Sequence, residues 1–175
     1  NRGDLQLENV GFIANSAING GAIYNDGGDM RLTGVDLDTN TADYGGGIYN
    51  YAGQLTVTDS TIRANSSILG GGIYNEDGQT VEISDSALMN NSAPQFGSAL
   101  YTTSGAVHLS GNCILGNGAG IAVVNISRAT VDAVGNWWGT ERGPTLANYV
   151  GGDSVEGRVD VYPVSVAPPA RCYTE

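Results

Sequence analysis

Lysine is absent from this chain of 175 residues, and the basic side chains are seven arginines and one histidine. Against them stand 18 aspartate and glutamate residues, which gives a formal net charge of −11 at pH 7. Such an excess of negative charge repels nucleic acid phosphates and anionic membrane surfaces. We therefore expect no nucleic acid partner.

Long apolar runs are also missing. No segment approaches the roughly 20 apolar residues that a membrane-spanning helix needs. No charged segment followed by an apolar one opens the sequence, as it would in a signal peptide. The sequence therefore predicts a mature chain without a membrane span.

Cysteine occurs only twice, as Cys113 and Cys172. The two lie far from the spacings of zinc or redox motifs, and we expect neither a metal nor a cofactor. An even number of cysteines suits one disulfide formed in an oxidising compartment, and the alternative is a pair of unbonded buried thiols. A bond between them would fold the end of the chain back on itself and contribute about 4 kcal/mol.

Glycine, by contrast, is abundant, with 27 residues, and it recurs in a hexapeptide. Gly-Gly-Ala-Ile-Tyr-Asn begins at Gly20, and Gly-Gly-Gly-Ile-Tyr-Asn begins at Gly45 and again at Gly70. A degraded copy starts at Gly97. A fixed period of about 25 residues is typical of stacked supersecondary units, so we interpret the chain as a solenoid.

Three columns of apolar residues follow the same period, each through intervals of 25, 25, 26, 26 and 24 residues. The first column is Leu5, Met30, Leu55, Val81, Val107 and Val131; the second is Leu7, Leu32, Val57, Ile83, Leu109 and Ala133; the third is Phe12, Leu37, Ile62, Leu88, Ile114 and Trp138. Residues two apart on a strand share a face, so the first two columns predict a strand with its apolar face inward.

These columns predict an all-β fold, a right-handed parallel β-helix of six to seven coils of about 25 residues. Residues 1–164 would form one domain that includes a seventh strand near Val159 and Val161, and residues 165–175 a tail that folds back or contacts a neighbour. Asparagines recur three residues after the third column and predict a ladder of stacked amides. Trp138 is expected to close the end of the core.

Two kinds of segment resemble a known group. The Gly-Gly-x-Ile segments at Gly20, Gly45 and Gly70, joined to segments such as Phe12-Ile13-Ala14-Asn15, resemble the repeats of chlamydial polymorphic outer-membrane proteins. Together with Asn136-Trp137-Trp138-Gly139, they more broadly resemble secreted or surface bacterial right-handed β-helix repeat proteins. The resemblance implies an extracellular or cell-surface location and a structural or adhesive role.

Many polysaccharide lyases and hydrolases share this architecture, so an enzyme is the rival interpretation. Their sites need converging carboxylates and a basic residue. Here His108 stands alone in an outward column, and we expect the pairs Asp36 with Asp38 and Asp26 with Asp29 to be solvated rather than to hold a cation. We therefore predict no catalytic residue and no enzymatic activity.

A vertical stripe of tyrosines is the candidate binding surface. If Ile23 and its counterparts face inward, strand alternation turns Tyr24, Tyr49, Tyr74 and Tyr101 outward. A rigid ring with a polar tip suits glycans or a neighbouring protein. The alternative is a stripe that the chain's own loops or tail cover.

The amino-terminal end is the candidate assembly surface. Leu5 and Leu7 begin the repeat almost at once, and a solenoid end exposes core side chains and unpaired strand groups. We therefore expect subunits to stack head to tail into a surface fibre, with the strand around Val159 and Val161 adding to the next subunit's edge. The alternative is an adhesin passenger module that binds glycans or host surfaces.

Overall fold

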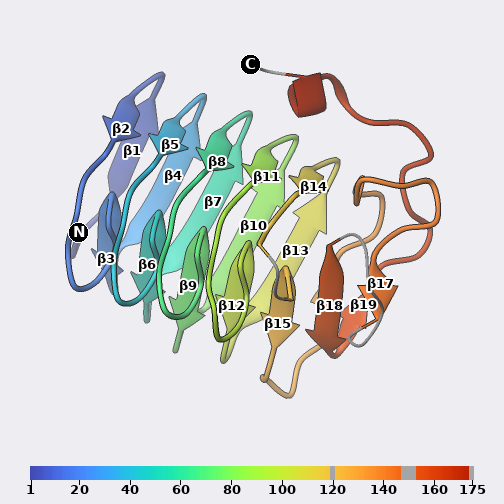
Figure 1. The fold of residues 1–175 in the computed structure, drawn as a ribbon. Coiled ribbons are helices and arrows are strands. Elements are labelled where there is room, and N and C mark those ends of the chain that lie inside the picture. The colour runs from blue at the N-terminus through green and yellow to red at the C-terminus, as the bar shows by residue number, and fades with distance from the viewer. Residues whose placement is uncertain (119–120, 147–152, 174–175) are drawn as a thin grey trace.

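The computed structural model describes residues 1–118, 121–146 and 153–173, and the chain winds into a rod of stacked coils (Figure 1). Three parallel β-sheets run along the rod, because each coil contributes one strand to each side. The predicted all-β solenoid is therefore confirmed.

The first sheet contains the first two apolar columns and has seven strands. In spatial order they are β1 (Leu5–Glu8), β4 (Asp29–Thr33), β7 (Gln54–Thr58), β10 (Thr80–Ser84), β13 (Ala106–Ser110), β16 (Val131–Asp132) and β19 (Val159–Asp160). Leu5 pairs with Met30 and Leu7 with Leu32, as the repeat predicts. The strand expected near Val159 is β19, which pairs with β16.

The second and third sheets complete each coil. The second contains the third apolar column, in the order β14 (Cys113–Leu115), β11 (Ala87–Met89), β8 (Thr61–Arg63), β5 (Asp36–Asp38) and β2 (Gly11–Ile13). The third contains the hexapeptides, in the order β17 (Thr145–Leu146), β18 (Ser154–Gly157), β15 (Val123–Asn125), β12 (Leu100–Thr102), β9 (Ile73–Glu76), β6 (Ile48–Tyr51) and β3 (Ile23–Asp26). A short 3₁₀ helix, η1 (Ala170–Tyr173), lies in the tail.

The hexapeptide glycines make the corner that leads into the third sheet. Gly45 has φ of 64°, and a Cβ there would collide with the carbonyl oxygen of Ile48. A side chain at this position would therefore force the corner open. The isoleucine that follows turns inward, since Ile48 and Ile73 are both fully buried.

The predicted asparagine ladder is present and buried beyond its first member. Each member up to Asn91 donates its backbone N–H and one side-chain Nδ2–H to Oδ1 of the asparagine one coil further on, over 2.9 to 3.1 Å. The members are Asn15, Asn40, Asn65, Asn91 and Asn117. A second ladder joins the hexapeptide asparagines Asn25, Asn50 and Asn75. Both ladders satisfy polar groups that the interior would otherwise leave unpaired.

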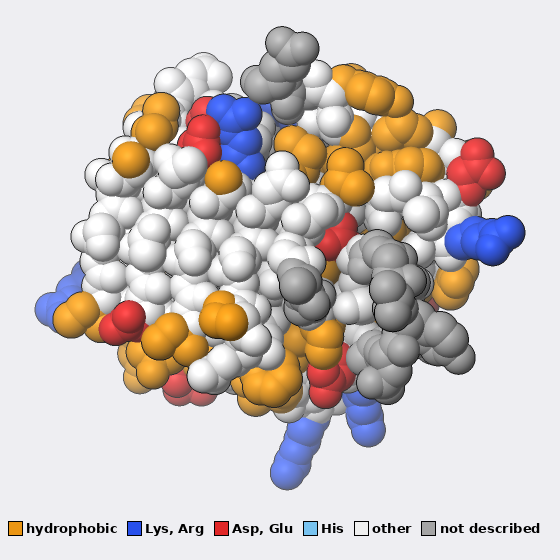
Figure 2. All heavy atoms as spheres, in the orientation of Figure 1, with side chains coloured by type: hydrophobic (Ala, Val, Ile, Leu, Met, Phe, Trp, Pro, Cys, Tyr) orange, Lys and Arg blue, Asp and Glu red, His pale blue; other side chains and the backbone are white. Residues whose placement is uncertain are grey.

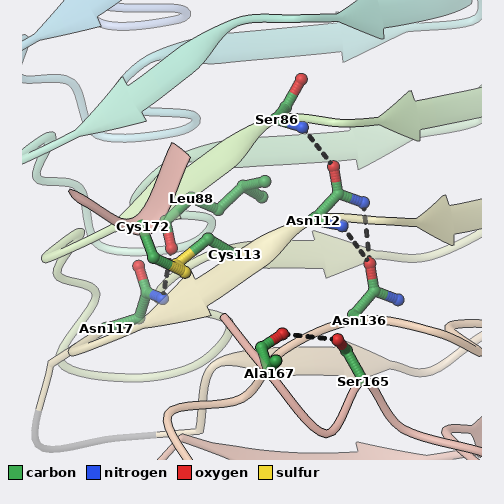
Figure 3. Close-up of a disulfide and its surroundings, with 9 residues drawn as sticks. All are labelled: Ser86, Leu88, Asn112, Cys113, Asn117, Asn136, Ser165, Ala167 and Cys172. Atoms are coloured by element: carbon green, nitrogen blue, oxygen red, sulfur yellow. Dashed lines mark hydrogen bonds between the residues drawn. A yellow bond between two sulfur atoms is a disulfide. The ribbon is translucent and has the colours of Figure 1, made fainter. Parts of the chain in front are cut away.

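The carboxyl-terminal end of the rod is closed by large side chains and by the tail. Trp138 is 1% exposed and packs in the core cluster, as predicted. A disulfide joins Cys113 on β14 to Cys172, so the predicted pairing is confirmed. Figure 3 shows η1 held against the outer side of β14 by this bond, and Figure 1 shows the chain returning along the rod to reach it.

Candidate functional site

The four predicted tyrosines form a column on the outer side of the third sheet, stacked from Tyr24 to Tyr74 and tilted by 48° between Tyr74 and Tyr101. The rings of Tyr24 and Tyr49 lie 5.1 Å apart, those of Tyr49 and Tyr74 also 5.1 Å, and those of Tyr74 and Tyr101 5.3 Å. The rings pack in a cluster separate from the core. Alternation therefore predicted their direction correctly.

These four side chains are less accessible to solvent than the side chains of an open binding stripe would be. Tyr49, Tyr74 and Tyr101 are 6 to 8% exposed, and only Tyr24 is half-buried. Neighbouring rings of the column cover one another, and Leu69 packs against the same cluster. The stripe is thus mostly covered by its own members and by neighbouring loop residues, which was the alternative expectation.

Burial changes the chemistry of these phenols. Burial raises the pKa of Tyr49 and Tyr74 far above the ordinary value, and the nearby Glu76 carboxylate raises both further. The Tyr49 hydroxyl donates a hydrogen bond to Glu76. Burial also raises the pKa of Tyr24 and Tyr101. The column therefore favours neutral phenols, which suits packing rather than proton transfer near pH 7.

An exposed apolar ridge lies beside this column and was missed from the sequence. Its members come from the corner that precedes each hexapeptide: Ile18, Tyr44, Ile68 and Phe96 are 71, 39, 40 and 43% exposed. Tyr44 packs near Tyr49 and Tyr74, and Phe96 packs near Tyr101. Figure 2 shows hydrophobic side chains gathered along the lower edge of the view, below a broad area of polar groups and backbone. Tyr44 and Phe96 share a register column with Asn19 and Leu69, and this column is the signal that could have revealed the ridge.

The groups considered for catalysis are dispersed. His108 Nδ1 lies 3.6 Å from Asp132 Oδ2, and both side chains are more than half exposed. On the second sheet, Arg63 lies 2.9 Å from Asp38 and 3.8 Å from Asp36, so an arginine balances this acidic pair. Within the described ranges, no group of three or more histidine, cysteine, aspartate or glutamate residues could hold a metal ion.

The other acidic pair lies beside the amino terminus. Arg2 forms an ion pair of 2.6 Å with Asp26, at a largely exposed position. Asn1 joins the same corner, since its ammonium group donates to Tyr24 O and its carbonyl oxygen accepts from Asp26 N. Asp29 lies at the start of β4 and pairs with Gln54. Asp26 and Asp29 therefore have separate surroundings.

Among the described residues, the first coil forms the outer edge of the rod at this end. Strands β1 and β2 are the outermost strands of their sheets at this end of the rod. Leu5, Leu7 and Phe12 are only half-buried. One coil further on, Met30, Leu32 and Leu37 are each 1% exposed. Asn1 covers part of β3, but β1 and β2 pair with described residues on one side only. The apolar columns thus reach the surface at this end.

At the opposite end, β19 and β17 are the outermost strands of the first and third sheets, and each has two residues. Val159 is half-buried, and Val161 is 6% exposed in the core cluster. The regular coil therefore shortens here. In the part of the chain that the structure describes, no helix has the length and apolarity to cross a membrane.

Comparison with known proteins identifies one relationship. The family model described as "Right handed beta helix region" matches residues 2–136, which include the strands from β1 to β16. No curated protein and no solved structure matches the chain.

Proposed function

Because the chain belongs to the right-handed β-helix family, we propose that it is a non-enzymatic structural rod that stacks head to tail through its amino-terminal coil. The observation that carries this proposal is the partly exposed core at β1 and β2. A second copy would cover that surface with a further coil. The proposed setting is extracellular, where the disulfide between Cys113 and Cys172 is stable.

Three features of the first coil support stacking. The edges of β1 and β2 have backbone groups that a parallel strand can pair with. Leu5, Leu7 and Phe12 provide apolar surface, whereas their counterparts in the second to sixth coils are buried. The Oδ1 atom of Asn15 accepts no hydrogen bond from the described residues, although each later asparagine of the ladder accepts two. A coil placed on this face would therefore find the same contacts that join the coils within the chain.

Head-to-tail stacking is favoured over a two-fold pairing of amino-terminal faces. A copy displaced along the rod keeps all three sheets in line, whereas a two-fold rotation aligns only one sheet with its counterpart. The strands that would meet β1 and β3 are the short β19 and β17. The contact is therefore weaker than an internal one, and association should depend on concentration.

The dispersed polar groups support a role without catalysis. The His108 imidazole and the Asp36 and Asp38 carboxylates lie on different sheets, and Arg63 balances the acidic pair. Glycosidases need two carboxyl groups that flank one bond. Incubation with acidic polysaccharides should therefore release no reducing or unsaturated ends, and such a release would contradict this part of the proposal.

The main test compares assembly of the wild-type chain with that of two variants. Light scattering and electron microscopy over a range of concentrations should show rods that lengthen as concentration rises. Leu5→Glu with Leu7→Glu should abolish lengthening. Gln6→Glu, which adds the same kind of charge on the outward side of β1, should not. Monodisperse single rods at high concentration would contradict stacking, as would native material whose mass includes a further coil ahead of Asn1.

An adhesive role is the second candidate, and the exposed ridge of Ile18, Tyr44, Ile68 and Phe96 supports it. Exposed aromatic and aliphatic side chains in a row can contact the apolar face of a sugar or another protein. Tyr44→Ser with Phe96→Ser should then abolish binding to glycans or cell surfaces while leaving assembly unchanged. Equal binding by this variant would exclude the ridge as the adhesive surface.

A further inference from the structure

The tyrosine column belongs to a larger array of phenol rings on the outer side of the third sheet. The ring of Tyr44 lies 6.4 Å from that of Tyr49 and 5.8 Å from that of Tyr74. Tyr44 is 39% exposed, whereas Tyr49 is 8% exposed. The array therefore connects the covered ring of Tyr49 to solvent through a single neighbouring ring. Its members are Tyr24, Tyr44, Tyr49, Tyr51, Tyr74 and Tyr101.

Tyr49 also has a proton acceptor within its own contacts. Its hydroxyl donates a hydrogen bond to Oε2 of Glu76, which lies one coil further on at the end of β9. Glu76 is half-buried, so solvent reaches the carboxyl group from one side. The ion pairs between described residues do not include Glu76. No cation in that part of the chain therefore weakens its affinity for a proton.

The carboxylate beside Tyr24 has different surroundings. Asp26 is in register with Tyr51, and Tyr51 is in register with Glu76. Asp26 forms an ion pair of 2.6 Å with Arg2, and a nearby positive charge stabilises the ionised form of a carboxyl group. Glu76 is therefore the better proton acceptor of the two.

Loss of an electron reverses the acid strength of a phenol. In the resting chain the phenol holds its proton firmly, because burial and the Glu76 carboxylate raise the pKa of Tyr49 far above its ordinary value. A phenol that has lost an electron is a strong acid, so oxidation is easiest where a base takes the proton at the same time. A positioned base typically accelerates such a proton transfer about 100- to 10,000-fold. Glu76 is in place to act as that base.

We propose that Tyr49 is a one-electron oxidation site, with Glu76 as the acceptor of its proton. The co-reactant is a one-electron oxidant from solution, such as a peroxyl radical or an oxidised metal complex. One electron passes from Tyr49 through the ring of Tyr44 to the oxidant, and the hydroxyl proton moves to Glu76. The products are a neutral phenoxyl radical, a protonated carboxyl group and the reduced oxidant.

This chemistry differs from enzymatic turnover, because each chain captures one oxidising equivalent at the site. It is also independent of stacking, since β1 and β2 take no part in it. The array is thus assigned a chemical role in addition to its packing role.

The test is oxidation of the folded chain by photogenerated tris(bipyridine)ruthenium(III). Transient absorption would measure the rate of phenoxyl radical formation, and electron paramagnetic resonance would identify the radical as neutral. The wild-type chain should react more slowly in deuterium oxide than in water, because the hydroxyl proton moves together with the electron. Equal rates in the two solvents would overturn the proposal, and this measurement needs no substitution.

Three variants separate this site from the other tyrosines. Tyr49→Phe keeps the ring and should slow radical formation by at least about tenfold. Glu76→Gln keeps a hydrogen-bond acceptor but removes the base, and it should slow the reaction by a similar factor. The two changes combined should cause no further loss, because both remove the same step. Glu82→Gln removes an exposed carboxylate on β10 and should leave the rate unchanged.

Two results would contradict the assignment to Tyr49 and Glu76. An unchanged rate in Tyr49→Phe or in Glu76→Gln would overturn it and would assign the oxidation to exposed rings such as that of Tyr173, which is 70% exposed. An equal loss of rate in Glu82→Gln would also overturn it, since the cationic oxidant would then respond only to the charge of the chain.

Discussion

Tyr49 and Tyr74 lie face to face on the outside of the third sheet, with ring centroids 5.1 Å apart and planes 5° from parallel. Each ring therefore supports its neighbour in the next coil. The same two rings lie outside the core cluster, so the column joins coils independently of the apolar interior. This separation makes its contribution to stability measurable.

Truncation of one ring should weaken the rod. Tyr74→Ala removes a buried ring with a neighbour on each side, and we expect a loss of about 3 kcal/mol in the free energy of unfolding. Tyr74→Phe keeps the ring and should lose no more than about 1 kcal/mol. Denaturant unfolding followed by circular dichroism measures both. Equal losses would assign the effect to the hydroxyl group instead.

Alkaline pH should destabilise the column. The pKa values of Tyr49 and Tyr74 are raised from the ordinary 10.0, so the folded chain keeps these protons while the unfolded chain releases them. Stability is therefore fully present below about pH 10 and declines as pH rises above it. Phenolate absorbance and circular dichroism, recorded together, should show these phenols ionising only as the rod unfolds. Their ionisation in the folded state would contradict the assigned burial.

Substitution of a ladder asparagine should lower the free energy of unfolding strongly in the interior of the ladder and only weakly at its exposed end. Asn65→Ala removes the partner of two Asn40 donors and two donated bonds, and we expect a loss of about 3 kcal/mol or more. Asn15→Ala, at an exposed position, should lose less than about 1 kcal/mol. Thermal and denaturant unfolding would compare them. A similar loss for both would mean that the ladder acts locally and not through burial.

The disulfide should stabilise the carboxyl-terminal coils. Cys172→Ser should lower the free energy of unfolding by about 4 kcal/mol, because it releases a closed loop of 59 residues in the unfolded chain. A reductant should lower the stability of the wild-type chain and leave the variant unchanged. Equal stability with and without reductant would show that the bond contributes nothing.

Because of Asp153, the free energy of unfolding of the rod should fall as the pH rises in mildly acidic solution. Burial raises the pKa of this carboxyl above 3.8, so the folded chain binds the proton more tightly than the unfolded chain does. Stability should therefore decline from about pH 4 up to the raised pKa. Asp153→Asn should remove this decline and be the more stable form near pH 7. Identical pH profiles for the two forms would contradict the raised pKa.

The repeat made most of the fold predictable. A period of 25 residues placed Leu55, Ile62 and Ile73 in the interior, and all three are at most 1% exposed. The same register predicted the amide ladder, because a corner repeated in each coil brings the same residue type into contact along the rod. The pairing of Cys113 with Cys172 was one of two alternatives, and their count alone could not decide between them.

Features that depend on contact between corners were less accessible to sequence reasoning. Alternation placed Tyr49 on the outside of the sheet, but it could not show that the corner residues Leu69 and Tyr44 would pack against the tyrosine column. Asp153 follows Asn117 after 36 residues, so the fixed period gave no sign that it continues the ladder. Both cases involve neighbours in space that the regular register does not bring together in sequence.

The amide ladder also gives the rod an electrical direction. From Asn15 to Asn91, each Nδ2 donates one hydrogen bond to Oδ1 in the next coil, and each Oδ1 from Asn40 to Asn117 accepts from the previous coil, so the amides keep one orientation along the axis. The second Nδ2–H of Asn40, Asn65 and Asn91 donates to a backbone carbonyl oxygen one coil back. The donor end of this row meets the carboxylate of Asp153, as an anion meets the amino-terminal end of a helix. Copies stacked in one direction would add their dipoles, whereas copies related by a two-fold axis would cancel them.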